Sequence, residues 1–113
     1  MYRILIIQTF AGKNPRWKQS VDLSNVRYRL YFSWNTRMRS WFMSILDGDD
    51  NTLLGGVRLV PEIDLLAKYR ASVPGLPSGI ISVLDRQSDP ATAEITRDNL
   101  GTRFLLSYTE TGG

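Results

Sequence analysis

The chain of 113 residues is the length of one domain, and its 42% hydrophobic and 22% charged residues are ordinary for a soluble globular protein. It contains no Cys and no His. This excludes thiolate nucleophiles, disulfides, Cys/His zinc sites and imidazole bases. Because the residues that most enzyme mechanisms use are absent, we expect a protein with no catalytic activity, no cofactor and no metal ion.

The longest apolar run is Ile4–Ile7, far shorter than the ~20 residues that a membrane-spanning helix needs. The same run is too short for the apolar part of a signal peptide, and no small-residue cleavage site follows it. We therefore expect no membrane partner, and a protein that works where it is made or is carried inside a larger assembly.

Positive charge is concentrated in the first third of the chain. Residues 1–39 contain eight Lys or Arg and one acidic residue, a net charge of +7, whereas residues 40–113 contain six basic and ten acidic residues, a net charge of −4. Most of the basic residues are Arg, whose planar guanidinium suits packed interfaces. This asymmetry predicts a basic surface that faces nucleic acid or an acidic protein; the simpler alternative is a solvated sheet face.

Short apolar segments separated by turn residues run along the chain, and no segment has the length and period of an amphipathic helix. The alternation is clearest from Tyr28 to Trp34, where every second residue is apolar. This pattern is typical of an all-β protein. The expected strands are Tyr2–Gln8, Trp17–Leu23, Val26–Trp34, Trp41–Asp47, Thr52–Val60, Ile80–Asp85 and Arg103–Tyr108.

The connections carry their own signals. Ser24-Asn25 fits a two-residue hairpin link, and Gly55-Gly56 inside a strand indicates a bulge or a close backbone approach. Ile63–Tyr69 is the one segment suited to a short helical turn, although an extended conformation fits it equally. Residues 86–99 predict a long polar connection, with or without a turn of helix, and residues 109–113 predict a flexible C-terminal tail.

About seven short antiparallel strands in a single β domain, residues 1–113, predict a small barrel or sandwich, because a flat sheet would leave half of its aromatic residues in water. The alternation also predicts which side chains form the core. These are Ile4, Ile6, Tyr28, Leu30, Phe32, Trp41, Met43, Ile45, Leu59, Ile81, Val83, Phe104 and Leu106.

Two acidic patterns are candidate sites. Asp47, Asp49 and Asn51 alternate as in the opening of a calcium loop, but the positions that need Gly and Glu hold Thr52 and Arg58. An acidic hairpin turn is the better interpretation. Most other acidic residues fall in expected turns, so nothing predicts two carboxylates facing each other across a cleft. The Gly pair is not a phosphate-binding loop, since no Gly-Lys-Ser/Thr follows it.

The segment from Arg27 to Trp34 interleaves cations with aromatic residues, as single-strand nucleic-acid binders do. The strand period places the other rings in the core and leaves Tyr31 alone beside Arg27 and Arg29, so nucleic acid is the second hypothesis. Under this hypothesis the protein is a small OB-like barrel that binds nucleic acid through the basic stretch from Arg27 to Arg39. The candidate partner-contact residues are Arg27, Arg29, Tyr31, Arg37 and Arg39.

From the middle of the chain onward, short motifs follow one another in a fixed order: Trp41–Gly48, Leu54–Pro61, Asp64–Leu66, Tyr69, Gly79–Asp85, Asp89-Pro90 and Asn99–Tyr108. This order resembles a family of small phage proteins described as baseplate plugs of contractile tails. The expected first and third strands also fall where that family has strands, so the resemblance covers nearly the whole chain. The family more often has Asp where this chain has Asn99.

The resemblance implies a structural subunit at the centre of the tail baseplate, without enzymatic activity or cofactor. Its implied partners are other baseplate proteins, namely hub, tail tube or spike, and an axial position also allows a homo-oligomer around the tail axis. Its implied location is the virion, after assembly in the host cytoplasm. A tube-end adaptor of similar build is a third hypothesis.

Overall fold

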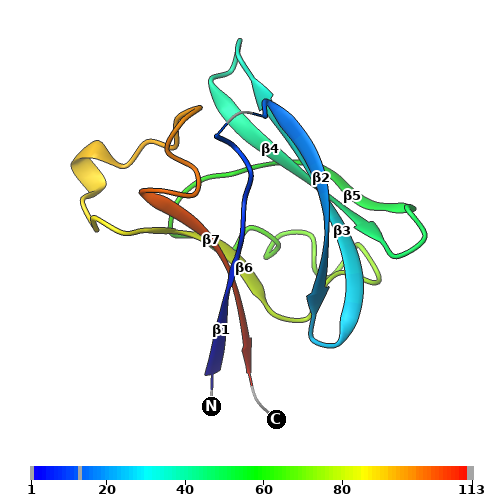
Figure 1. Ribbon diagram of the computed structural model, residues 1–113. Coiled ribbons are helices and arrows are strands. Elements are labelled where there is room, and N and C mark those ends of the chain that lie inside the picture. The colour runs from blue at the N-terminus through cyan, green and yellow to red at the C-terminus, as the bar shows by residue number, and fades with distance from the viewer. Residues whose placement is uncertain (1, 13, 112–113) are drawn as a thin grey trace.

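The computed structural model describes residues 2–12 and 14–111. All seven expected strands are present, and their ends differ from the expected ones by at most three residues. They form two antiparallel sheets, ordered β1-β7-β6 and β2-β3-β4-β5, which pack as a sandwich and do not close into a barrel (Figure 1). The strands are β1 (Tyr2–Ile7), β2 (Arg16–Leu23), β3 (Val26–Asn35), β4 (Ser40–Asp47), β5 (Thr52–Arg58), β6 (Ile80–Asp85) and β7 (Phe104–Thr111).

Local sequence signals fix two features of the four-stranded sheet. Ser24 and Asn25 both have positive φ values, 52° and 64°, as the favoured two-residue hairpin turn between β2 and β3 requires. In β5, Gly55 and Gly56 lie opposite the single residue Ser44, because the register slips between β4 and β5. The backbone N–H of Gly56 donates to Ser44 Oγ at 3.0 Å. The expected hairpin link and bulge are both confirmed.

One hydrophobic core contains side chains from both sheets. In β3, Tyr28, Leu30 and Phe32 are buried while their alternate neighbours are at least partly exposed, as the period of two predicts. Every expected core residue outside the first strand is buried. The two-residue period therefore identifies the core wherever polar and apolar residues alternate clearly.

Trp41 is the centre of the core beneath β4, and none of its surface is exposed. Its ring meets Trp17 of β2 and Trp34 of β3 edge to face, at centroid distances of 5.4 and 5.5 Å. Its indole N–H donates to the backbone carbonyl of Thr96 at 3.1 Å. Such aromatic pairs each add about 0.5–1.5 kcal/mol beyond their burial, and the buried N–H has a partner. Trp41 therefore links β2, β3 and β4 to residues 86–103, the long connection between β6 and β7, which we call the 86–103 connection.

The expectation for β1 is wrong about which face is buried. Ile4 and Ile6 are 60% and 47% exposed, whereas Ile7 is buried. Leu5 pairs with Tyr108 and Ile7 with Leu106, and both of these partners in β7 are buried. The odd-numbered residues of β1 therefore face the core. The run Ile4–Ile7 has no polar residue to mark one face, so the alternation rule had no signal to use.

Ile63–Tyr69 forms consecutive turns rather than a helix. Glu62 N–H donates to Val83 O at 2.8 Å and Leu65 N–H donates to Ile81 O at 2.9 Å, so the start of the segment lies along the outer edge of β6. The hydrogen bonds within the segment, from Ala67 N–H to Asp64 O and from Tyr69 N–H to Leu66 O, join residues three apart, as in turns. The one helical turn of the described residues is the 3-10 turn Pro90–Thr92, inside the long polar connection.

The C-terminal expectation needs a correction as well. β7 continues to Thr111, and residues 109–111 pair with β1 across the register from Tyr2 to Ile4. These three residues are therefore part of the sheet and not of a free tail. Gly112 and Gly113, the rest of the expected tail, lie outside the described residues.

A buried hydroxyl holds the end of the sandwich together. Tyr108 of β7 is 1% exposed, and its hydroxyl accepts from Gly79 N–H at 2.8 Å and lies 2.7 Å from Ser24 Oγ in the β2–β3 turn. Gly79 lies so close that a Cβ there would be 2.5 Å from Thr109 O and 2.6 Å from Tyr108 Cζ. The absence of a side chain at Gly79 is thus a condition for this contact.

We predict that Gly79→Ala lowers the free energy of unfolding by roughly 2–3 kcal/mol, because the added methyl must displace backbone or the buried ring. Gly12→Ala is the matched control, since nothing lies within 4 Å of a Cβ at Gly12. It should change stability by less than about 1 kcal/mol. Urea unfolding monitored by tryptophan fluorescence measures both. Equal effects of the two substitutions would contradict the prediction.

Candidate interaction surfaces

The outer face of the four-stranded sheet carries three of the five candidate contact residues. Arg27, Arg29 and Tyr31 alternate along β3 and point away from the core, as expected. Tyr31 lies opposite Lys18 of β2 on one side and Ser44 of β4 on the other. These residues form one surface, which includes a shallow hollow of about 270 Å³ beside Tyr31.

The charges of this part of the face are largely paired within the chain. Arg27 Nε lies 2.6 Å from Asp22 Oδ1, and Arg29 Nη1 lies 2.9 Å from Asp50 Oδ2. Lys18 lies 3.5 Å from the other oxygen of Asp50. The hydrogen bond from Arg27 lowers the pKa of the Asp22 carboxyl. These neighbouring carboxylates reduce the positive potential that Arg27 and Arg29 present to a partner.

Arg37 and Arg39 lie in the β3–β4 hairpin, at the opposite end of the strand from Arg27. An extended strand rises about 3.3 Å per residue, so Arg27 and Arg37 lie tens of ångströms apart along the sheet. The five candidate residues therefore divide into Arg27, Arg29 and Tyr31 along β3 and Arg37 and Arg39 in the hairpin at its far end. Contiguity in sequence spreads residues along a strand instead of gathering them.

Two arginines that the sequence analysis missed lie close to this hairpin. Arg16 of β2 and Arg58 of β5 end the row that crosses β3 at Ser33 and β4 at Phe42 on the outer face. The sheet register places them at the same level on opposite edges of this face, although they are 42 positions apart in the chain. We call Arg16, Arg37, Arg39 and Arg58 the hairpin arginine group.

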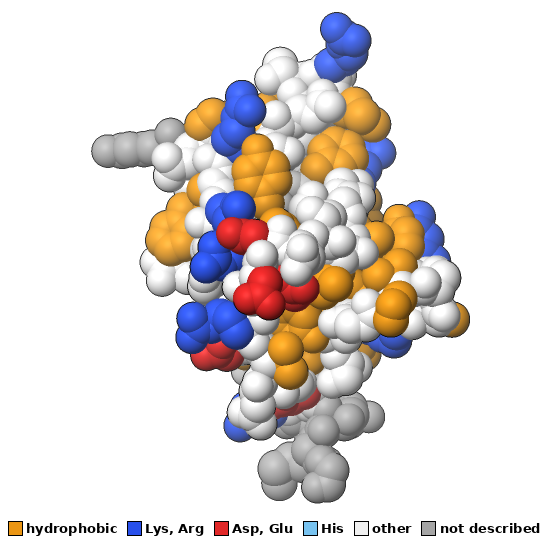
Figure 2. Space-filling view, turned by 90° about the vertical axis from the view of Figure 1, so that its right-hand side faces the viewer, with side chains coloured by type: hydrophobic (Ala, Val, Ile, Leu, Met, Phe, Trp, Pro, Cys, Tyr) orange, Lys and Arg blue, Asp and Glu red, His pale blue; other side chains and the backbone are white. Residues whose placement is uncertain are grey.

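The hairpin arginine group forms no ion pair with the described residues, whose ion pairs involve other cations. Figure 2 shows the difference along this side of the molecule: acidic side chains lie beside Lys and Arg midway up, whereas Lys and Arg near the top have no acidic neighbour in view. Arg39 lines a small hollow with Glu94 and Asp98, and the exposed side chain of Met38 lies between the two hairpin arginines. This end combines available positive charge with exposed apolar surface.

A second surface lies on the three-stranded sheet. β1 is an edge strand, paired only with β7, and its residues Ile4, Leu5 and Ile6 are all substantially exposed. Ile80 of β6 is exposed in the same cross-strand row as Ile4. The sequence signal was present in the apolar run at the start of the chain, but it was interpreted as core.

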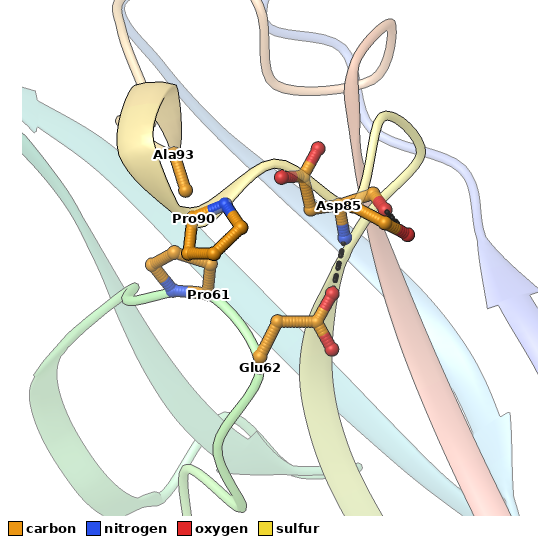
Figure 3. Close-up of a pocket in the computed structure, with 6 residues that line it drawn as sticks. Pro61, Glu62, Asp85, Pro90 and Ala93 are labelled. Carbon is orange, nitrogen blue, oxygen red and sulfur yellow. Dashed lines mark hydrogen bonds between the residues drawn. The ribbon is translucent and has the colours of Figure 1, made fainter.

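A hollow of about 530 Å³ lies between the start of the Pro61–Leu65 segment and the 3-10 turn (Figure 3). Its two carboxylates, Glu62 and Asp85, are both engaged. Glu62 accepts from the backbone N–H of Asp85 at 2.8 Å. Asp85 accepts two hydrogen bonds from Arg103, at 2.9 and 3.0 Å, and further ones from the backbone N–H groups of Gln87 and Asp89.

Asp85 therefore has a structural role. The hydrogen bonds from Arg103 hold the pKa of its carboxyl well below its usual range, despite its burial. The arrangement fixes the long 86–103 connection to the end of β6, since Arg103 also donates to the backbone carbonyls of Thr92 and Asp89.

In the acidic hairpin between β4 and β5, the carboxylate of Asp47 forms hydrogen bonds within the turn. Asp47 accepts from the backbone N–H groups of Asp49 and Asn51, both at 2.9 Å, and from the Asn51 side chain at 3.2 Å. These hydrogen bonds, that of Asn51 N–H above all, lower the pKa of Asp47.

Among the described residues no group of three acidic side chains is arranged to hold a metal ion. No described helix is long and apolar enough to cross a membrane.

The family of this fold is decided by comparison of the whole sequence. The model of the family described as cyanophage baseplate Pam3 plug gp18 matches residues 4–111. The chain belongs to this family. The match spans all seven strands apart from the first two residues of β1. It confirms the resemblance that the order of motifs indicated, and it makes the protein a member of a baseplate plug family. A search among curated proteins gave no significant match.

We predict that Asp85→Asn lowers the thermal midpoint at pH 7 by roughly 5–10 °C, because it leaves Arg103 without its partner. The pKa of Asp85 is lower in the folded than in the unfolded chain. Its contribution to stability is therefore present above the unfolded pKa of about 3.9, and it is lost as the pH falls further.

Thermal unfolding of the wild type and of Asp85→Asn between pH 7 and 2.5 tests this prediction, and the thermal midpoints of the two proteins should converge below about pH 4. Asp22→Asn is the control, because Asp22 forms an exposed ion pair that contributes little to stability. A difference between wild type and Asp85→Asn that stays constant with pH would contradict the role assigned to the carboxylate.

Proposed function

We propose that this protein is a structural subunit of a contractile phage tail, located at the centre of the baseplate as a plug and in contact with hub, tube or spike proteins. The observation that carries the proposal is the family match over residues 4–111. The surface chemistry supports it. The carboxylates of the hollow at Glu62 and Asp85 are occupied by internal hydrogen bonds, while exposed arginines and an apolar strand edge are available for contacts.

The hairpin arginine group is the part of the basic face best suited to an acidic protein neighbour. Arg16, Arg37 and Arg58 form no ion pair among the described residues, so a docking carboxylate would not need to displace one, whereas Arg39 shares its hollow with Glu94 and Asp98. Arginine forms bidentate pairs with carboxylates and is enriched in interfaces, where apolar surface such as that of Met38 adds to binding. Arg27, Arg29 and Tyr31 extend this face at its more neutral end.

Nucleic acid fits this face less well. A single-strand binder needs several exposed rings on which bases stack, together with cations that follow the phosphates. On β3, Tyr28 and Phe32 are buried, and the aromatic rings that the described strands place on the outer face, Tyr31 and Phe42, are both half-buried. Two half-buried rings are a weak stacking platform, so we favour a protein partner.

The first experiment is to fractionate purified virions of the phage that encodes the protein and to locate it by quantitative mass spectrometry. We expect it in the tail fraction, at a fixed ratio to the hub proteins. Its absence from virions would overturn the proposed function. Salt-dependent binding to single-stranded DNA, with a steep loss of affinity as salt rises, would then support nucleic acid as the partner.

The partner-contact surface is tested by two matched double reversals, each of which lowers the net charge by four. Arg37→Glu with Arg58→Glu should reduce incorporation into baseplates at least tenfold, because both arginines are free of internal ion pairs. Arg27→Glu with Arg29→Glu should have a smaller effect, because Asp22 and Asp50 already offset those two charges.

In this assay the wild-type protein and one variant are supplied together during phage assembly, and the amount of each in purified tails is measured. Far-UV circular dichroism and thermal midpoints of the purified variants provide the folding control. Incorporation of the folded Arg37/Arg58 variant at the wild-type level would exclude the hairpin arginine group as a contact.

A further inference from the structure

The four edges of the two sheets differ in how well they are protected against pairing with another strand. The outer edge of β6 is covered by the segment that begins at Pro61, which donates backbone hydrogen bonds to Val83 and Ile81. The edge strand β5 is interrupted by its Gly55-Gly56 bulge. β2 carries a charged residue at most of its outward positions. Bulges, charges and covering segments are the usual protections of an edge strand.

β1 has none of these protections. Ile4, Leu5 and Ile6 are 60%, 44% and 47% exposed, and the strand is regular along its whole pairing with β7. Its one charged residue, Arg3, is already paired with Glu110 at 2.6 Å. An edge strand that has no such protection and exposes apolar side chains on both of its faces is a site for the addition of another strand.

We propose that β1 pairs antiparallel with β1 of a second copy of this chain, across a two-fold axis at Leu5. The two three-stranded sheets then become one six-stranded sheet with the two β1 strands at its centre. The interface is isologous, so the same strand must be complementary to itself. It is the one combination of described edges in which both strands are unprotected.

The sequence of β1 meets this condition. With the axis at Leu5, that residue lies opposite its own copy, Ile4 lies opposite Ile6, and Arg3 lies opposite Ile7. Residues of the same parity face each other, so the inner and outer faces of both sheets continue across the axis. All the exposed apolar residues of the strand are then opposite apolar residues, and no like charges meet.

Neighbouring registers and the end of the strand support the same axis. An axis at Ile4 would place Arg3 opposite Leu5 and leave Ile7 without a partner strand residue. Beyond Ile7, the carbonyl of Gln8 accepts from the Gln19 side chain at 2.7 Å, so β2 closes the edge at that point. The pairing is therefore confined to β1, and its centre lies within the exposed run.

Because the natural chain contains no Cys, a single introduced thiol reports the register directly. Leu5→Cys places two sulfur atoms opposite each other, at a Cα separation within the range that a disulfide spans. Under mild oxidation we expect a covalent dimer to form at least tenfold faster than for Ile63→Cys, whose position is equally exposed but lies away from β1. Equal rates for the two variants would overturn the proposed register.

Sedimentation velocity across a range of concentrations tests the dimer itself. The wild-type mass should rise from 12.9 kDa toward twice that value, and Ile4→Lys with Ile6→Lys should weaken association at least about 100-fold. Ile63→Lys with Ile80→Lys adds the same charge at exposed isoleucines outside the edge and should change the dissociation constant less than about threefold.

A wild-type protein that stays at 12.9 kDa at several hundred micromolar would overturn the proposal, as would equal dissociation by both Lys pairs. Thermal midpoints of the variants establish that each is folded. The inference rests on the free edge and not on the baseplate assignment, so its failure would leave the proposed function intact.

Discussion

The sandwich depends on one close approach, at which the hydroxyl of Tyr108 reaches the backbone of Gly79 and the side chain of Ser24. A buried tyrosine hydroxyl needs partners, and here they come from the loop before β6 and from the β2–β3 turn of the other sheet. The contact sets where the two sheets meet at this end. Trp41 has the same role further along, through its indole hydrogen bond to Thr96 in the 86–103 connection.

This packing also decides which surfaces are left for partners. The Pro61–Leu65 segment and the bulge in β5 occupy or disrupt two of the four sheet edges, and β1 remains open. On the four-stranded sheet, the register gathers Arg16 and Arg58 near the β3–β4 hairpin, while Asp22 and Asp50 offset the arginines at the other end.

The carboxylates of Asp85 and Asp47 hold irregular loops in place. Asp85 and Asp47 are saturated with hydrogen bonds from Arg103 and from turn backbone, which keeps both ionised and fixes the loops around them. Groups used in this way stabilise irregular connections that have little apolar surface of their own. The long 86–103 connection keeps its shape through Arg103, which binds Asp85 and two carbonyls of that connection.

The sequence alone determined the all-β class, the seven strands, the Ser24-Asn25 turn, the Gly bulge and the core of β3, because those features follow from period-two alternation and turn residues. It placed Arg27, Arg29 and Tyr31 together on one face for the same reason. Tertiary structure decided the rest. The inward face of β1 depended on its pairing with Tyr108 and Leu106, since an unbroken apolar run marks neither face. Likewise, only the sheet register could place Arg16 and Arg58 at the hairpin end of one sheet face, because positions far apart in the chain share a row through strand pairing and not through local pattern.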